Sequence, residues 1–274
     1  VAEPDVGKTD QTTDLYHRAD KEGVEFNPDG YDFQWLGQYG LESAIRVDAV
    51  RVNEDGTTSS SDKWQAHQFV LVDKDGKEHY VYCADFAVSP QAGSRYGMEN
   101  VEDADYYDSE AAGHIRAIAL NGYWGAANGA GSLDAVKQMM VDAYNNGEIN
   151  KDDYAGLATA WGFDTYLTDG MALAATQAAL WTFGNSGDLS IDTEDPFTSF
   201  YQAVSGNSWR SLDSREWALT KALYDYLVGM TEEPTDRTTL INENNFATGA
   251  SLTVGGRDED SGKYNADLTF TLAV

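Results

Sequence analysis

Cysteine is nearly absent from this 274-residue sequence, in which Cys83 is the only one. A single cysteine cannot close a disulfide within the chain, so the fold does not rest on a disulfide framework. Cys83 is therefore either a buried apolar side chain or a reactive thiol with a chemical purpose. Which of the two holds decides what the protein does.

Basic residues are also scarce. The chain carries 46 acidic and 18 basic residues, for a formal net charge of −28 at pH 7. Binding to nucleic acid or to an anionic membrane surface requires clustered Lys and Arg, so the composition argues against both. The same charge favours solubility and speeds the encounter with basic partners.

Long hydrophobic runs are missing as well. No segment reaches the ~18 apolar residues of a membrane-spanning helix. The start, Val1-Ala2-Glu3-Pro4, lacks the pattern of a signal peptide, and we expect it to be a mature or an artificially trimmed N-terminus. With 42% hydrophobic and 23% charged residues, the composition is that of a globular protein. The 16 Tyr and 7 Trp, with abundant Thr, Ser and Asn, are typical of a secreted or surface protein.

The first part of the chain has the patterns of β-strands. Strands are predicted over the segments 45–52, 65–72 and 79–86. Between the last two, Asp73-Lys74-Asp75-Gly76 is typical of a hairpin turn, because Asp and Gly tolerate the turn dihedrals. The polar segment 53–62 is predicted to be a long loop.

The apolar period becomes helical from about residue 109. Helices are predicted over the segments 110–120, 132–146, 151–161, 169–184 and 216–228. The expected N-caps are Ser132, Thr168 or Asp169, and Asp213 or Ser214. Pro196 is expected to open a further short helix at its first position.

Strand patterns return near the end of the chain, at 246–254 and 264–274. Strands followed by helices and again by strands predict an α+β fold. We expect a single domain over 1–274, in which 1–108 and 235–274 are mainly β and 109–234 is an inserted helical part. In the simplest topology the final strands close onto the first sheet.

One polar residue lies on an apolar helix face. Gln177 is three or four positions from Leu173, Leu180 and Trp181, so it shares their side of the predicted helix. Burying its amide costs about 2 kcal/mol or more unless the amide is hydrogen-bonded. Either a backbone group satisfies the amide, or the amide has been consumed chemically.

A chemical explanation pairs Gln177 with Cys83. A Cys thiolate can attack a carboxamide carbon held close to it, and loss of ammonia then leaves a thioester. In a water-poor pocket such a bond survives hydrolysis, and it can later acylate an amine. The alternative is an inert core cysteine and a glutamine that is simply hydrogen-bonded.

The residues that carry this chemistry match a known pattern. Tyr82-Cys83, followed by Thr176-Gln177-Ala178-Ala179-Leu180-Trp181, resembles the thioester domains of Gram-positive surface adhesins. In that family an aromatic or aliphatic residue precedes Cys in a strand. A Thr-Gln-x-Ala element follows on a helix, with large apolar residues three and four positions after Gln. The predicted β-rich part with a helical insertion is also similar to the family's architecture, so the resemblance covers most of the chain.

The resemblance implies an intramolecular thioester between Cys83 and Gln177 at the tip of an extracellular, cell-wall-anchored adhesin. Such a domain reacts once, without turnover and without a cofactor, and captures an amine, expected to be a lysine of a host surface or matrix protein. We expect a monomer that neither binds nucleic acid nor inserts into a membrane. The residues predicted to surround or assist the thioester are Tyr82, Thr176, Trp181 and His114, followed by Tyr123 and Trp124.

Other chemistries have less support. His67 and His79 lie on the two strands of the predicted hairpin, but further ligands at zinc spacing are missing. An acidic run lacks the spacing of a calcium loop, and a solvated loop is expected for Glu99, Glu102, Asp103, Asp105, Asp108 and Glu110. Three other functions stay open: a carbohydrate-active enzyme with paired carboxylates, a cysteine-dependent enzyme, or a non-covalent adhesin with an inert Cys83.

Overall fold

The computed structural model confirms the α+β class. It describes residues 14–19, 22–86, 88–101, 104, 106–157, 159–185, 189–202, 208–232, 251–257 and 264–269. The chain divides into two compact units, Val1–Glu232 and Glu233–Val274, and each is described by itself.

An eight-stranded antiparallel sheet makes up the β part of the first unit. Its central path runs in the order β1-β5-β2-β3-β4, while β6 and β7 pair with β2 and β8 pairs with β7. The strands are β1 (Asp14–Arg18), β2 (Phe33–Val52), β3 (Thr58–Asp73), β4 (Glu78–Tyr82), β5 (Arg95–Asn100), β6 (Leu189–Ile191), β7 (Ser199–Gln202) and β8 (Ser208–Ser211).

Two predictions about the segments between these strands were wrong. The segment 53–62 is not a long loop, because a tight turn at Gly56 (φ 78°) leads directly into β3 at Thr58. Pro196 does not open a helix. Its carbonyl accepts a hydrogen bond from the backbone N–H of Asp48 at 2.9 Å, so the segment before β7 is held alongside β2 instead.

The helices of the first unit are α1 (Ser109–Asn121), α2 (Leu133–Asn145), α3 (Trp161–Tyr166), α4 (Asp169–Gly184) and α5 (Ser214–Val228), with a short 3-10 turn η1 (Lys151–Asp153). A continuous helix over 151–161 was a wrong prediction. Gly156 lies between η1 and α3 with φ at 102°, a left-handed conformation that no helix contains. A side chain there would also come within 2.8 Å of the Ser214 carbonyl oxygen.

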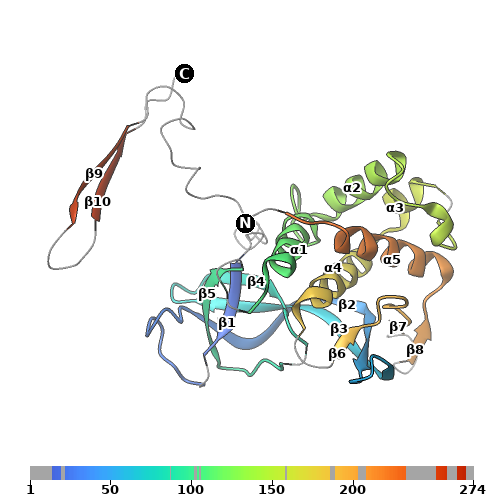
Figure 1. Cartoon of the computed structure of the whole chain (residues 1–274), viewed down its shortest axis with the longest axis horizontal. Helices are drawn as coiled ribbons and strands as arrows, with labels where there is room; N and C mark the ends of the chain where they lie inside the picture. Colours follow the sequence, from blue (N-terminus) through green and yellow to red (C-terminus); the bar gives the residue numbers. More distant parts are fainter. Residues whose placement is uncertain are drawn as a thin grey trace. The chain divides into compact units, whose positions relative to one another are not determined.

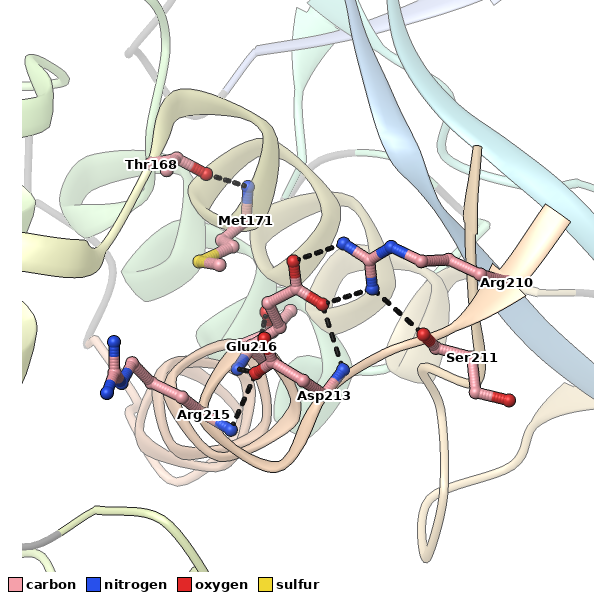
Figure 2. Close-up of polar contacts among 8 residues, drawn as sticks. Thr168, Met171, Arg210, Ser211, Asp213, Arg215 and Glu216 are labelled. Carbon is pink, nitrogen blue, oxygen red and sulfur yellow. Dashed lines mark hydrogen bonds and ion pairs between the residues drawn. The ribbon is translucent and has the colours of Figure 1, made fainter. Parts of the chain in front are cut away.

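The predicted caps explain where α4 and α5 begin (Figure 2). The Thr168 hydroxyl accepts from the backbone N–H of Met171 at 3.3 Å. Asp213 and Glu216 form a capping box, in which each side chain accepts from the other residue's backbone N–H, at 2.8 and 2.9 Å. Arg210 adds a two-pronged ion pair to Glu216, at 2.6 and 2.5 Å, and so ties β8 to the start of α5.

Helix α4 lies in the core. It packs against β2, β3 and β6 and against α1, α2 and α5, and Figure 1 shows it between the sheet and the other helices. Every residue from Met171 to Trp181 is buried, so the helix has no polar face. Five of these residues are alanines, whose small side chains let neighbouring elements approach closely from several sides.

The second unit contains β9 (Ser251–Arg257) and β10 (Tyr264–Thr269), which pair with each other antiparallel in a two-stranded sheet. Both final strands are therefore confirmed within the described residues, and their closure onto the first sheet stays a prediction. Nowhere in the described ranges is a helix both long and apolar enough to cross a membrane.

Candidate functional site

Cys83 lies where the chain leaves the sheet. Strand β4 ends at Tyr82, which pairs with Gln68 of β3, so a strand continuing to residue 86 was a wrong prediction. From Cys83 onward the backbone bonds to α4 and its end instead of to a neighbouring strand. The backbone N–H groups of Cys83 and Phe86 donate to the side chains of Gln177 and Asn185, at 3.2 and 3.1 Å.

Two hydrogen bonds join the Gln177 carboxamide to the backbone of Cys83. The Cys83 N–H donates to Oε1 at 3.2 Å, and Nε2 donates to the Cys83 carbonyl oxygen at 2.7 Å. Gln177 has no exposed surface, so these bonds satisfy an amide that is costly to bury. The backbone group that satisfies the amide thus belongs to the residue whose sulfur is predicted to attack it.

The loop after Cys83 is held tightly against α4. Gly184 lies so close to the Ala84 carbonyl group that an added Cβ would overlap the oxygen and lie 3.2 Å from the carbon. Phe86 packs edge-on against the Trp181 ring, with centroids 5.3 Å apart. Only glycine permits this approach, so Gly184 allows the residue after Cys83 to lie against the end of α4.

Burial raises the pKa of the Cys83 thiol from an ordinary 9.0 to about 11. The Trp181 indole and the Asp85 backbone lower that pKa by a smaller amount, and the Asp85 charge raises it. Sγ donates a hydrogen bond to the Asp85 carbonyl oxygen at 3.2 Å. At neutral pH the sulfur therefore carries its proton, which is available to a leaving amide nitrogen.

Tyr82 and Thr176 both position the segment that follows α1. The Thr176 hydroxyl donates to the Ala172 carbonyl at 2.8 Å and accepts from the Tyr123 backbone N–H at 3.0 Å. The Tyr82 hydroxyl donates to the Tyr123 carbonyl oxygen, and the Tyr82 ring lies edge-on to Trp124, with centroids 4.9 Å apart. These four residues form one packed group beside Cys83 and Gln177.

Trp181 is buried, and its indole lowers the pKa of the Cys83 thiol. Its indole N–H has no acceptor of ordinary hydrogen-bond geometry within the described part of the chain.

His114 contacts other residues than the proposed thioester pair. It stacks on Phe183 with centroids 4.1 Å apart, and its Nδ1 is 2.6 Å from the Met230 carbonyl oxygen. The Cys83 sulfur donates to the Asp85 carbonyl oxygen, and the Cys83 N–H donates to Gln177. Neither hydrogen bond involves His114.

The other histidines have partners of their own. His79 is 2.9 Å from the Asp73 carboxylate, whereas His67 packs against Tyr39 and Phe69. Across the described ranges, no group of three or more His, Cys, Asp or Glu side chains is arranged to hold a metal ion. Glu102, Asp103 and Asp105 of the acidic run lie outside the described residues.

An apolar cavity of about 410 Å³ adjoins Cys83. Aromatic rings form much of its wall, among them those of Tyr16, Trp35, Phe69, Tyr96, Tyr107 and Trp124. The cavity also reaches Asp85 and Tyr106, which the sequence analysis did not single out. Asp85 is two positions after Cys83, and that proximity was the one signal that could have identified it.

The sequence of this chain matches a known protein family. The model of a family described as the thioester domain matches residues 80–233, more than half of the chain. The matched range contains both Cys83 and Gln177. Neither the curated proteins nor the solved structures include a significant match to the chain.

Proposed function

Because this chain belongs to the thioester domain family, whose members are adhesin-type domains containing a thioester, we propose that Cys83 and Gln177 form that bond here and that it captures an amine-bearing target. One observation carries the assignment of these two residues: the Gln177 carboxamide is hydrogen-bonded at both ends to the backbone of Cys83. Cys83 is also the only cysteine in the chain.

The bond forms by exchange of sulfur for nitrogen on the Gln177 side-chain carbon. Sγ attacks Cδ, the thiol proton passes to Nε2, the C–N bond breaks and ammonia leaves. Oxygen Oε1 gains charge during the attack, and the Cys83 N–H, 3.2 Å away, is placed to stabilise it. The fixed amide and the loop held at Gly184 supply proximity, which accounts for a large part of the rate of intramolecular reactions.

In the capture reaction the sulfur of Cys83 is the leaving group and nitrogen is the attacking atom. A neutral amine attacks the same carbon, the C–S bond breaks, an amide forms, and Sγ recovers a proton. The amide is more stable than the thioester, so the domain reacts once and does not turn over as an enzyme. Complete burial of Gln177 slows the competing hydrolysis, because water has little access to the acyl carbon.

The proposed partner is a host surface or matrix protein that offers a lysine. A net charge of −28 supports a basic partner, since opposite charge increases the encounter rate. Thioester domains occur in surface adhesins, which indicates an extracellular location, and we propose that the protein is anchored to the cell wall.

Intact mass spectrometry tests the thioester. The untreated protein should be lighter than its sequence mass by one ammonia, and methylamine should add to Gln177 while exposing one thiol at Cys83. Cys83→Ala should keep the full sequence mass and lose covalent capture, and Gln177→Ala should do the same. An untreated protein at the full sequence mass, with Cys83 already titratable, would rule the bond out.

A further inference from the structure

We propose that the cavity beside Cys83 is the docking pocket for the incoming amine, and that it selects a primary ammonium carried next to an apolar or aromatic group. A lysine with an aromatic or aliphatic neighbour is such a ligand. This inference rests on the proposed thioester function and adds the class of amine that the thioester accepts.

The size and walls of the cavity favour more than a bare amine. Its volume of about 410 Å³ is within the range of pockets that enclose small ligands, roughly 300–1,000 Å³. A lysine side chain fills only part of that space. Aromatic rings such as those of Trp35, Tyr96 and Trp124 line the remainder, so an adjoining apolar group would gain from burial there. The same rings attract a cation through their faces.

An acidic residue lies in the mainly apolar wall of the cavity, close in sequence to the reacting sulfur. Asp85 lines the cavity and is only 6% exposed. Its main-chain oxygen accepts the hydrogen bond from Cys83 Sγ at 3.2 Å, and its Oδ2 accepts one from the Tyr106 hydroxyl at 2.7 Å. A charge buried to this degree attracts an opposite charge more strongly than a surface carboxylate does.

A second polar group lies in the same wall. The Tyr107 hydroxyl is buried and has no hydrogen-bond partner within the residues that the structure describes. It is close to Gly184, since a Cβ added there would be 3.5 Å from it, so it lies near the contact that holds Cys83. Burying a hydroxyl without a partner is costly, and an ammonium N–H donating to its oxygen would remove that cost.

Basic groups of the cavity lie nearer to solvent. His17 is exposed and 3.8 Å from the Glu99 carboxylate, while the half-buried Arg18 donates to the Ser89 carbonyl oxygen at 3.0 Å. Solvent weakens the repulsion between such groups and an entering cation. The buried Asp85 therefore has the stronger influence on an amine close to the sulfur.

The charge balance of capture is consistent with this pocket. The amine arrives as an ammonium and must lose one proton to attack. The completed reaction converts an ammonium and a thioester into an amide, a thiol and one released proton. In the proposed pocket Asp85 binds the ammonium, and the released proton passes to solvent.

Amine selectivity tests the pocket on the full chain. Addition rates should be measured by intact mass for methylamine, 4-phenylbutylamine and 6-aminohexanoate, each normalised to its rate with a small free thioester. We expect 4-phenylbutylamine to exceed methylamine by about tenfold or more, because its chain and ring are buried. The carboxylate of 6-aminohexanoate would lie in an apolar wall, so this amine should show no enhancement.

Asp85→Asn should reduce the normalised rate of 4-phenylbutylamine about tenfold without changing the loss of ammonia, since a hydrogen bond to a charged group is lost. Glu148→Gln is the matched control. It also removes one carboxylate that accepts a tyrosine O–H, here from Tyr226 at 2.8 Å, but it is exposed and does not line the cavity. Its rates should equal those of the wild type.

A competition experiment covers the case in which Asp85→Asn fails to form the thioester. In the wild type, N,N-dimethyl-4-phenylbutylamine should slow methylamine addition, and the uncharged 4-phenylbutanol should slow it much less. Equal normalised rates for all three amines, or no slowing by the tertiary amine, would refute the proposed docking pocket. Neither result would contradict the proposed thioester. A wild-type protein with the full sequence mass, and so without loss of ammonia, would instead refute the proposed function.

Discussion

Substitution of Gly184 tests whether a close approach between α4 and the Cys83 loop assembles the site. In Gly184→Ala the new Cβ would overlap the Ala84 carbonyl oxygen and lie 3.2 Å from its carbon. Backbone atoms cannot rotate away as a flexible side chain can, so the loop must move by about 1 Å to relieve the overlap. A displacement of that size can lower the rate of a positioned reaction about 100-fold.

The effect on stability can be worked from the same contacts. In the Cys83→Ala background, which keeps the Gln177 amide, overpacking costs about 1–3 kcal/mol, and weakening the two hydrogen bonds between Gln177 and the backbone of residue 83 costs about 1 kcal/mol each. Replacing glycine by alanine in a helix returns up to about 1 kcal/mol. We therefore expect Gly184→Ala to lower the free energy of unfolding of Cys83→Ala by about 2–4 kcal/mol.

Gly170→Ala is the matched control, because it makes the same change in the first turn of α4. A Cβ at Gly170 would be 3.6 Å from the Ser43 hydroxyl oxygen, an ordinary contact, so stability should be unchanged or slightly higher. The assay is the fraction of protein lacking ammonia, followed by intact mass over time after purification, together with urea denaturation. Complete and rapid thioester formation in Gly184→Ala would refute the positioning role of this contact.

Three further predictions concern Thr176, Cys83 and Asp213. Thr176→Val should lower the free energy of unfolding, measured in urea, by about 1–3 kcal/mol, because the buried Tyr123 N–H loses its acceptor. Thr176→Ser keeps a hydroxyl and should retain most of the stability. Equal losses in both variants would contradict this prediction. After methylamine opens the thioester, the alkylation rate of Cys83 should rise with pH around a midpoint of about 11, whereas a midpoint near 9 would show an exposed thiol. Because the Cys83 pKa is raised in the folded state, the methylamine-treated protein should keep its full stability below pH 9 and lose part of it as the pH rises through 11. The untreated protein, whose sulfur is bound in the thioester, should show no such loss. Asp213→Ala should cost about 1–2 kcal/mol in thermal or urea unfolding through loss of the capping box, and an unchanged stability would show that the box contributes nothing.

Local signals predicted the helix boundaries well. Ser132, Thr168 and Asp213 cap the helices as expected, since a capping side chain bonds to backbone only two or three residues away. The short strands β6, β7 and β8 were missed within the segment predicted as helical. Strands β6 and β7 form because β2 pairs with them, and a pairing partner more than a hundred residues away leaves no local pattern. Strand β8 then pairs with β7.

Among the residues predicted to surround or assist the thioester, those next to the motif were identified and those brought together by the fold were not. Thr176 and Tyr82 were identified through the motif, and both do pack beside Cys83 and Gln177. His114 was predicted without a spacing argument, and the fold directs it to Phe183 and the Met230 carbonyl instead. Tyr107 and Gly184 were not identified, because their roles depend on contacts that only the folded chain creates.

By itself the sequence determined the two partners of the proposed bond. A lone cysteine after an aromatic residue, and a glutamine within an apolar helix, are anomalies of composition and period that can be recognised without coordinates. Only the tertiary structure decided what surrounds them. The amide-to-backbone pairing, the close approach at Gly184 and the cavity that contains Asp85 each join residues distant in sequence, and the shape and burial that govern amine access arise only when α4 packs against the sheet.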